Sequence, residues 1–352
     1  MWLNQSFPAI GRRERNLSTD HLIHVAVIGV GAFGRNHARV YQQLAKAGLG
    51  VHLVGVVDSN LERGNRVAQE FGCRAFVSLE PLLSAHPDIQ AASVAVPTLH
   101  HLAVARQLME AGIDLLIEKP LVASLDEANE LSRLAQRSGR IVQVGHLERF
   151  NPAVRATLPI LTRPMFFEVH RLSEFTPRSL DIDVVLDLMI HDLDVVLSFA
   201  KSPVGTIRAV GLPVLTDKVD IANVRVEFES GCVANFTASR VSTERVRKLR
   251  FFQPKQYVSI DYSRQDVLVF SVGHNDPAAT ASVNPQIQVA RLPTAAVEPL
   301  QAELKSFLDC VRSRSQPVVS LDDGRRALSL ALDILAAIRE HGNRLHLEEL
   351  GP

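Results

Sequence analysis

The sequence has little cysteine and no excess of either charge. Its three cysteines among 352 residues are Cys73, Cys232 and Cys310, and no two of them form a CxxC pair. This usage excludes a disulfide scaffold and a thiolate zinc site, and it is typical of a reducing, cytoplasmic setting. Lys and Arg together number 38, as do Asp and Glu, so no long-range field favours nucleic acid or a membrane surface as a partner. A small-molecule substrate is the better interpretation.

Long apolar runs and metal-binding histidine patterns are also missing. No segment is long and apolar enough to span a bilayer. Residues 1–21 lack the continuous apolar stretch of a secretory signal and are interpreted as an N-terminal tail. The 13 histidines contain no HxH or HExxH spacing, so no metal site is expected.

The length and the apolar content predict two domains. The chain of 352 residues exceeds the size at which one hydrophobic core usually stops growing, and 46% hydrophobic residues suffice for two cores. From Leu22 to Gly145, short β-branched runs alternate with helical patterns, which predicts a parallel sheet covered on both faces. We therefore expect an α/β Rossmann domain over residues 22–145. Its strands are expected at 24–28, 51–57, 92–96, 113–117 and 141–144, and its helices at 35–47, 61–71, 99–111 and 125–137.

The pattern changes after Gly145. A helix-rich stretch up to Ala200 is followed by strand candidates over about 207–289, with a hairpin turn at residues 229–231. Two amphipathic helices end the chain, at about 296–312 and 322–341. This half predicts a C-terminal α+β domain over residues 146–352, built on a largely antiparallel open sheet, that completes the active site.

A glycine-rich loop lies between the first expected strand and the first expected helix. Gly29 permits a tight turn, Gly31 lets the backbone approach a pyrophosphate, and Gly34 allows the helix to pack closely on the strand. Ala32 and Phe33 complete this GxGxxG pattern. A helix that begins here offers free N–H groups to phosphates, so we expect the loop to bind a dinucleotide.

An acidic residue strengthens this interpretation. Asp58 ends the second expected strand, where a carboxylate accepts hydrogen bonds from the adenosine ribose. No Arg or Lys stands immediately beside Asp58 to hold a 2′-phosphate, so NAD is favoured over NADP. The alternative is a glycine turn followed by an aspartate that only caps a helix.

A lysine stands at the edge of the expected sheet. Lys119 follows the strand expected at 113–117, and ligands bind at the carboxyl ends of strands in such folds. Its ammonium would face a substrate oxygen there, and Pro120 permits a cis peptide that would aim Lys119 inward. The alternative is a solvated lysine where the strand ends.

An almost wholly apolar helical segment carries four polar residues. They fall at i, i+4, i+8 and i+11, on one stripe of a helix, and are Asp183, Asp187, His191 and Asp194. A buried helix turns such a stripe toward water or toward a cleft. Because a histidine four residues from a carboxylate is the arrangement that a general base needs, His191 is the candidate. The alternative is a solvent-facing stripe with a helix-stabilising pair.

Together these motifs resemble the Gfo/Idh/MocA oxidoreductases, the family of glucose-fructose oxidoreductase and inositol dehydrogenase. The resemblance covers nearly everything from Leu22 to about Ile338. Many relatives have a Gly-Gly pair shortly before the Asp-x-x-x-His segment, whereas residues 179–184 lack one, which leaves the substrate contacts at that entry open. The motifs that carry the resemblance are Gly29-x-Gly31-x-x-Gly34, Asp58, Pro97-Thr98 with His101, Ala111-Gly112 leading to Glu118-Lys119-Pro120, Gly145-His146 with Arg149-Phe150-Asn151-Pro152, and Asp187-x-x-x-His191.

The resemblance implies roles for the residues at matching positions. Lys119 matches the active-site lysine, His191 the general acid/base, and Asp187 the carboxylate that orients the substrate or the histidine. The expected NAD-binding residues are Gly29, Gly31, Ala32, Phe33, Gly34, Asp58, Pro97, His101 and Glu118. The expected substrate-binding residues are Lys119, His146, Arg149, Asn151, Asp187 and His191. The family also implies a homodimer or homotetramer formed through the open sheet.

Within the family, the resemblance is strongest to bacterial enzymes that oxidise C3 of UDP-N-acetylglucosamine. Their 3-keto product passes to an aminotransferase for diamino-sugar lipid A. The matching stretches are residues 144–152, 181–194 and 239–250. A UDP-sugar needs cations for its diphosphate, which Arg149 and the basic residues of 240–250 would supply. The alternative for most of that cluster is an edge strand protected by charge.

The same motifs are compatible with three other functions. The same Lys, Asp and His set would serve a dehydrogenase of another polyol or of a UDP-hexuronate. A non-catalytic NAD-binding regulator would keep the glycine loop without needing His191. A reductase similar to biliverdin reductase is a weaker option, because it would need neither Asp187 nor His191.

Overall fold

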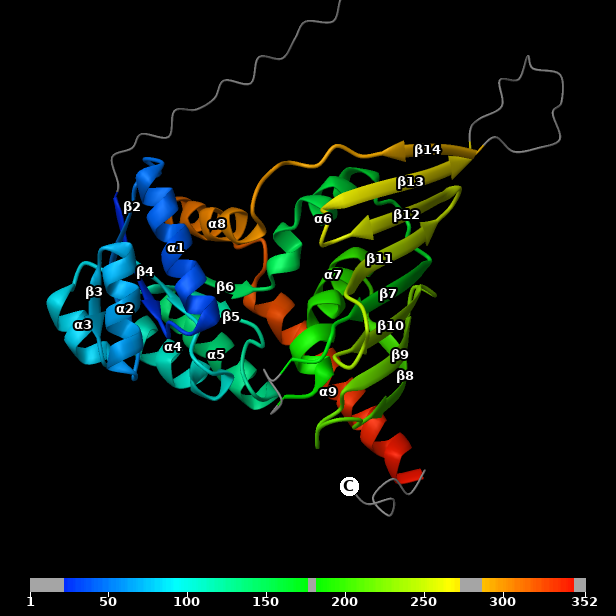
Figure 1. Ribbon diagram of the computed structural model, residues 1–352, viewed down its shortest axis with the longest axis horizontal. Coiled ribbons are helices and arrows are strands. Elements are labelled where there is room, and N and C mark those ends of the chain that lie inside the picture. The colour runs from blue at the N-terminus through cyan, green and yellow to red at the C-terminus, as the bar shows by residue number, and fades with distance from the viewer. Residues whose placement is uncertain (1–21, 177–181, 273–286, 345–352) are drawn as a thin grey trace, which may run out of the picture.

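The structure, a computed structural model, describes residues 22–176, 182–272 and 287–344. One sheet with its covering helices lies on one side of the molecule, a second sheet lies on the other, and the last helix runs from the first toward the second (Figure 1). The expected tail over 1–21 and the unusual residues 179–181 lie outside the described residues.

The first sheet is parallel, with strand order β3-β2-β1-β4-β5-β6. Its strands are almost wholly buried because helices cover both faces. The strands are β1 (Ile23–Ile28), β2 (Val51–Val57), β3 (Arg74–Phe76), β4 (Ala91–Val94), β5 (Asp114–Glu118) and β6 (Val142–Gly145). The helices are α1 (Ala32–Lys46), α2 (Leu61–Phe71), α3 (Leu79–Ala85), α4 (His101–Glu110) and α5 (Leu125–Ser138), with a 3-10 turn η1 (Thr98–His100). The predicted Rossmann sheet is confirmed, and the short β3 and α3 were not predicted.

Local sequence signals set several of these helix ends. Ser124 caps α5 by accepting the amide of Glu127 at 3.3 Å, as its spacing predicts. Gly72 and Gly139 end α2 and α5 with φ of +69° and +64°, a conformation that glycine adopts without steric cost.

The second sheet has the order β14-β13-β12-β11-β7-β10-β9-β8 and is antiparallel except between β7 and β10. The predicted, largely antiparallel sheet is therefore confirmed, including the hairpin turn before β10. Its strands are β7 (Phe166–Leu172), β8 (Val204–Leu212), β9 (Ile221–Phe228), β10 (Val233–Ser239), β11 (Val246–Gln253), β12 (Gln256–Asp261), β13 (Asp266–Val272) and β14 (Ile287–Arg291).

Strand β7 corrects the prediction of a helix-rich stretch up to Ala200. Its residues alternate between buried and partly buried positions, and Phe167, Val169 and Arg171 point to the buried side. A charged Arg171 among the buried positions hides the apolar alternation that normally marks a strand. The correction matters because β7 lies in the middle of the sheet, directly behind the helix that carries His191.

The remaining helices connect the two sheets. They are η2 (Leu147–Phe150), α6 (Pro152–Thr157), η3 (Leu158–Ile160), a π-helical turn (Val185–Met189) that runs into α7 (Ile190–Ala200), α8 (Pro299–Ser313) and α9 (Leu321–Arg344). Helix α8 shares a hydrophobic core with α1 and β1, whereas α9 packs against β8 and α7. A boundary between domains at residue 145 stays a prediction. Within residues 22–176, 182–272 and 287–344, no helix combines the length and the hydropathy required to cross a membrane.

Candidate active site

The glycine loop has the shape that a dinucleotide requires. Gly29 has a φ of +84°, and a Cβ on Gly34 would stand 1.8 Å from the carbonyl oxygen of Gly29. At Gly31, by contrast, a Cβ would meet nothing within 4 Å. Gly31 is the N-cap of the 15-residue α1, and no side chain caps the first turn. The open space and the free N–H groups therefore fit a pyrophosphate.

Asp58 ends β2 beside this loop and is 4% exposed. Its carboxylate accepts the amides of Val30 at 3.0 Å and Asn60 at 2.8 Å. It also accepts Nε and Nη2 of Arg63, at 2.8 and 2.7 Å. Burial would raise the pKa of Asp58, but these hydrogen bonds, led by the one from Arg63, outweigh burial and hold it below its ordinary value.

No Arg or Lys stands immediately beside Asp58 in the sequence, but the fold brings Arg63 onto its carboxylate. Arg63 lies five positions along the chain, so the first turn of α2 brings its guanidinium back onto the carboxylate. The residues directly after Asp58 are Ser59 and Asn60, so the adjacent sequence gives no sign of this cation. Ribose hydroxyls would have to share or replace these two hydrogen bonds.

Lys119 joins the end of β5 to the helix that carries His191. The peptide between Lys119 and Pro120 is cis. Nζ of Lys119 donates to the carbonyl oxygen of Asp187 at 2.7 Å and lies 3.6 Å from Oδ1 of the same residue. Burial lowers the pKa of Lys119, whereas the charges of Asp187 and Glu118 oppose this.

The four polar residues of the predicted helical stripe do not act together. The turn over Val185–Met189 is π-helical, which shifts the phase of everything after it, and such turns are frequent at functional sites. Asp183 precedes the helix and accepts the amide of Val219 at 2.9 Å. Asp194 is 2% exposed and turns to Arg149 at 3.4 Å. The predicted single stripe is therefore wrong. Of its four residues, Asp187 is the one that contacts Lys119.

Two histidines lie close to the charge of Lys119. Burial lowers the pKa of His191 well below its ordinary value, and the charges of Lys119 and Arg171 lower it further. Burial and then Lys119 lower the pKa of His146 to about 3. Nδ1 of His191 and both ring nitrogens of His146 are buried and meet no hydrogen-bond partner among the described residues. Both rings are therefore neutral near pH 7, with nitrogens available to a ligand.

Arg149 and Asn151, both predicted to bind substrate, are engaged within the protein. Arg149 donates to the carbonyl oxygen of Val318 at 3.1 Å as well as to Asp194. Asn151 caps α6 and donates to Glu148 at 3.0 Å and to the carbonyl oxygen of Tyr262 at 3.1 Å. Their substrate contacts stay predictions.

The predicted cofactor residues beyond the loop differ in exposure. Pro97 is exposed at the start of η1, and Phe33 is 53% exposed at the glycine loop. His101 is 1% exposed, and its ring nitrogens face the carbonyl oxygens of Val96 at 2.9 Å and Leu121 at 3.0 Å. Glu118 turns its carboxylate inward, to His37 at 2.8 Å.

A buried ionic network behind His191 was not predicted. Arg171 forms two hydrogen bonds with Asp192, at 2.6 and 3.0 Å, and a third with Glu148 at 3.1 Å. Its guanidinium also lies 5.2 Å from the ring centre of Tyr262. Because Asp192 is the neighbour of His191, the network anchors the start of α7 to the middle of the second sheet. The sequence shows an arginine at position 171, but neither its burial nor its strand was predicted.

The basic residues of 240–250 do not gather at one point, and the alternative of an edge strand is wrong, because β11 lies inside the sheet between β12 and β7. Arg240 is 5% exposed and pairs with Asp220, whereas Arg245 and Arg250 pair with glutamates at the surface. Arg247 is the cross-strand partner of Arg171, on the side of β11 that also carries Leu249. Among the described residues, Arg247 has no hydrogen bond or ion pair.

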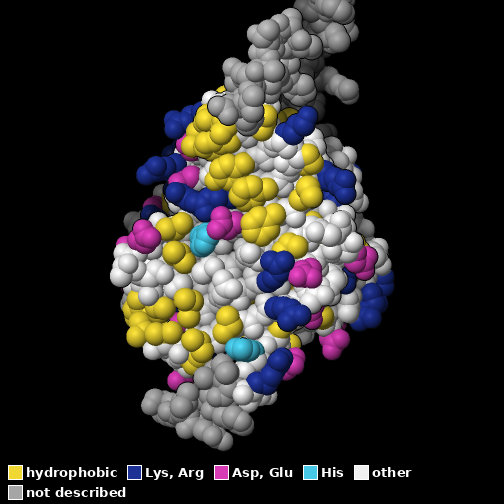
Figure 2. Space-filling view, turned by 90° about the vertical axis from the view of Figure 1, so that its right-hand side faces the viewer, with side chains coloured by type: hydrophobic (Ala, Val, Ile, Leu, Met, Phe, Trp, Pro, Cys, Tyr) yellow, Lys and Arg dark blue, Asp and Glu magenta, His cyan; other side chains and the backbone are white. Residues whose placement is uncertain are grey.

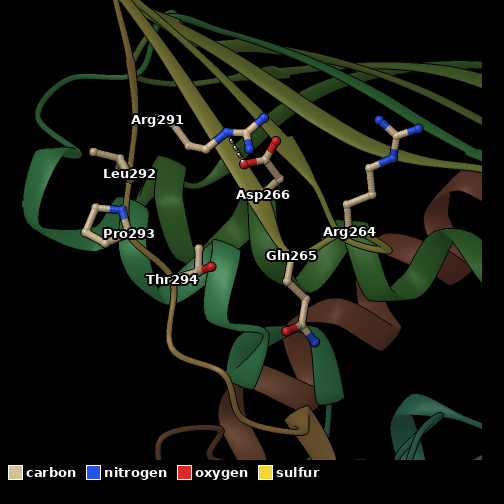
Figure 3. A pocket seen from close by; sticks show the side chains of 7 residues that line it. All are labelled: Arg264, Gln265, Asp266, Arg291, Leu292, Pro293 and Thr294. Carbon is tan, nitrogen blue, oxygen red and sulfur yellow. Dashed lines mark ion pairs between the residues drawn. The ribbon is translucent and has the colours of Figure 1, made fainter.

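A separate hollow of about 640 Å³ lies at the ends of β13 and β14. Figure 3 shows Arg291 facing Asp266 there, 3.1 Å apart, with Arg264 and Gln265 pointing away from the pair. Its lining residues, 264–266 and 291–294, include none of the predicted site residues. In the part of the chain that the structure describes, no group of three His, Cys, Asp or Glu side chains is placed to hold a metal ion.

The sequence matches two family descriptions. Residues 23–146 match the GFO/IDH/MocA "Oxidoreductase family, NAD-binding Rossmann fold", and residues 161–255 match the "GFO/IDH/MocA C-terminal domain". The UDP-N-acetylglucosamine 3-dehydrogenase of Acidithiobacillus ferrooxidans is 37% identical over 320 residues, which are 90% of this chain and 98% of that protein. The scyllo-inositol 2-dehydrogenase (NAD(+)) of Bacillus subtilis is 26% identical over 318 residues, which are 86% of this chain and 90% of that protein.

Solved structures of related proteins are similar to this chain in fold. The structure of the Acidithiobacillus ferrooxidans enzyme has a TM-score of 0.81 at 36% identity and covers 90% of this chain and 97% of its own. Levoglucosan dehydrogenase in complex with NADH has a TM-score of 0.79 at 16% identity, over 90% of this chain and 97% of its own, which shows a shared fold alone.

Proposed function

The chain belongs to the Gfo/Idh/MocA oxidoreductase family, and from this premise we propose that it uses NAD to oxidise a sugar hydroxyl to a ketone, namely C3 of UDP-N-acetylglucosamine. The observation that carries the proposal is the meeting of Lys119 with Asp187 beside His191. The 37% identity to a UDP-N-acetylglucosamine 3-dehydrogenase supports the choice of substrate.

In the proposed reaction, His191 accepts the proton of the sugar hydroxyl, and the ammonium of Lys119 stabilises the negative charge that develops on the oxygen. NAD, when bound, supplies the acceptor for the hydride that leaves the same carbon. His191 suits the role because burial and the Lys119 charge keep its ring neutral near pH 7. Asp187 holds the ammonium of Lys119 in place.

We propose that NAD lies along the carboxyl edge of the first sheet. Gly31 and the start of α1 would hold the pyrophosphate, and Asp58 would hold the adenosine ribose. Pro97 and His101, on the segment after β4, and Glu118 complete the proposed NAD site. We also propose that residues 22–145 form a dinucleotide-binding domain and residues 146–352 a substrate-binding domain.

We propose that the sugar end of the substrate contacts Lys119, His146, Asp187 and His191. The ring nitrogens of His146 are buried and unpartnered among the described residues, so they are free to bind a ligand hydroxyl or carbonyl. Arg247 is the better placed cation for the diphosphate, since Arg149 is already engaged with Asp194 and Val318. Asn151 would then act by shaping the loop before α6.

A homodimer or homotetramer is the proposed assembly. Figure 2 shows hydrophobic side chains gathered on the outer face of the second sheet. Phe252 stacks on Tyr257 at 4.8 Å between ring centres, and Tyr257 stacks on Phe270 at 5.0 Å. Phe252 is 37% and Ile287 is 71% exposed. A second copy of this chain would cover that surface.

We further propose a cytoplasmic enzyme whose 3-keto product an aminotransferase consumes for lipid A synthesis. All three cysteines are free, as a reducing compartment requires. The ketone of a nucleotide sugar is a substrate for amination. Oxidation of an alcohol by NAD at neutral pH is energetically uphill, so removal of the ketone would draw the reaction forward.

The test is to mix the purified protein with NAD and UDP-N-acetylglucosamine and to follow NADH, with an aminotransferase and glutamate present to remove the ketone. We expect turnover, and we expect His191→Ala to abolish most of it. Turnover on scyllo-inositol or a UDP-hexuronate instead would overturn the substrate while leaving the reaction class intact. NAD binding without turnover on any of these sugars would favour a non-catalytic regulator.

A further inference from the structure

A series of four buried polar side chains lies behind Lys119, and three of them, Tyr41, Ser93 and His37, have no role in the proposed reaction. The hydroxyl of Tyr41 lies 2.9 Å from Oγ of Ser93, and this Oγ lies 3.0 Å from Nδ1 of His37. Nε2 of His37 lies 2.8 Å from Oε1 of Glu118. His37, Tyr41 and Ser93 are all 0% exposed, and Glu118 is 9% exposed.

The carboxylate of Glu118 can only accept, so a neutral His37 ring carries its proton on Nε2 and donates it to Glu118. Nδ1 of His37 then accepts from Ser93, and Ser93 in turn accepts from Tyr41. Every hydrogen bond is then made by one donor and one acceptor. Since a buried polar group without a hydrogen-bond partner is energetically costly, the arrangement holds all four side chains in place.

The last hydrogen bond of this series reaches Lys119 itself. Oε2 of Glu118 accepts the backbone amide of Lys119 at 3.3 Å. A Cβ on Gly145 would come within 3.1 Å of the same carboxylate, so the neighbouring strand leaves the side chain of Glu118 little freedom. His101 holds the other end of the turn through the carbonyl oxygen of Leu121.

His37 therefore connects two parts of the proposed site. It lies on α1, three residues after Gly34, and α1 begins at the proposed pyrophosphate site. Through Glu118 it reaches the amide of Lys119, 81 to 82 residues further along the chain. A movement of α1 would thus move the lysine that is proposed to stabilise the reacting oxygen.

We infer that His37 is a positioning residue that holds Lys119 in its working place through Glu118. The inference rests on the proposed function only for what Lys119 does, not for where it lies. His37 touches neither substrate nor cofactor, and it acts through the two hydrogen bonds of its ring. Loss of the bond to Glu118 leaves a buried carboxylate that draws its oxygens away from the Lys119 amide.

The first test needs no substrate. The rate at which a water-soluble amine reagent acylates Lys119 is measured by mass spectrometry from about pH 7 to about pH 12, a range that brackets the ordinary lysine pKa of about 10.4. In His37→Leu we expect an apparent pKa closer to that of a free lysine and a higher limiting rate of labelling at alkaline pH, because the amine leaves its buried contact with Asp187. Tyr41→Phe is the matched control, since it removes a buried hydrogen bond of the same cluster but leaves the bond between His37 and Glu118. We expect the labelling of the control to follow the unaltered protein.

The second test uses turnover. We expect His37→Leu to lower kcat roughly 10- to 100-fold, the cost of misplacing a reacting group by a fraction of an ångström to an ångström, with KM for NAD changed less than about threefold. His37→Gln, whose amide can donate to Glu118 and accept from Ser93, should return kcat to within about threefold.

Several outcomes would overturn the inference. Labelling of Lys119 in His37→Leu that matches Tyr41→Phe is one, and a His37→Gln protein as slow as His37→Leu is another, because packing alone would then explain the loss. If His37→Leu does not fold, Glu118→Gln carries the same expectation for the labelling of Lys119, whereas its KM for NAD is no part of the test because Glu118 is also a proposed NAD contact. If the unaltered protein turns over no sugar, the proposed function fails, whereas the labelling result still decides the role of His37.

Discussion

Replacing Asp187 by Asn tests the electrostatic design of the site most directly. Nζ of Lys119 lies 3.6 Å from Oδ1 of Asp187, with the two side chains 11% and 26% exposed. Opposite unit charges at that distance attract by about 5 kcal/mol at an effective dielectric constant of about 20, an upper bound for a pair that water still reaches. Asn keeps the shape and the backbone carbonyl contact but removes this attraction. We expect kcat/KM for UDP-N-acetylglucosamine to fall roughly 10²- to 10³-fold, the range for losing one group that stabilises an oxyanion.

The pH profile gives the sign of the effect. Burial already lowers the pKa of Lys119, and the negative charge of Asp187 opposes that shift. Without that charge the pKa of Lys119 falls further, so the ammonium is lost at lower pH and the alkaline limb of the kcat profile moves toward neutral pH. Asp183→Asn is the matched control: it lies one helical turn earlier, accepts the amide of Val219 and does not touch Lys119. An alkaline limb that stays in place or moves to higher pH in Asp187→Asn would refute the reasoning.

Three further substitutions probe the cofactor, the substrate and the stability of the fold. Asp58→Ser removes the carboxylate that accepts the ribose hydroxyls and frees Arg63. The ratio of kcat/KM for NADP to kcat/KM for NAD should therefore rise about 100-fold or more. Adding Arg63→Ala should abolish this rise, and a rise that persists would show that Arg63 plays no part. Arg247→Ala should raise KM for UDP-N-acetylglucosamine about tenfold or more without changing KM for NAD. Lys248→Ala, on the opposite side of β11, should change neither KM. Equal effects of the two substitutions would contradict the assignment of Arg247 to the diphosphate. Asp220→Asn should lower the free energy of unfolding by about 3 kcal/mol or more near pH 7, because backbone amides and Arg240 hold the pKa of this carboxyl low. That contribution is fully present above the pKa of an unfolded aspartate and is lost as the pH falls through the lower pKa of the folded protein. Urea unfolding at pH 7 and in acid should therefore show that the difference in unfolding free energy between Asp220→Asn and the unaltered protein becomes smaller in acid. A difference that stays constant would contradict this prediction.

The ionic network behind α7 limits how strongly the Arg171 charge acts on His191. Arg171 is held by Asp192 and Glu148, so its charge is largely balanced within the protein. Burial then remains the main cause of the lowered pKa of His191, with Lys119 next. The proposed general base is thus kept neutral by its surroundings rather than by a single partner.

The sequence by itself determined the elements whose signals are local. Alternating apolar runs predicted the strands and helices of the first sheet, because burial on both faces leaves a strand no polar position to spare. The glycine loop, Asp58 and Lys119 were found because each role depends on a residue type at the end of a strand. The short β3 and α3 were missed, since three to seven residues give too little periodicity to detect.

Only the tertiary structure decided which of the candidate side chains meet. Lys119 and Asp187 are 68 residues apart, and their contact depends on how the second sheet and its helices pack against the first. The π-helical turn broke a stripe that ideal helical periodicity predicted, because an i, i+4 spacing holds only while each turn has 3.6 residues. Arg63, Arg171 and His37 act through partners that no spacing rule brings together. Local patterns record what each segment can form, whereas a site assembled across two sheets is fixed by packing between segments that are distant in the chain.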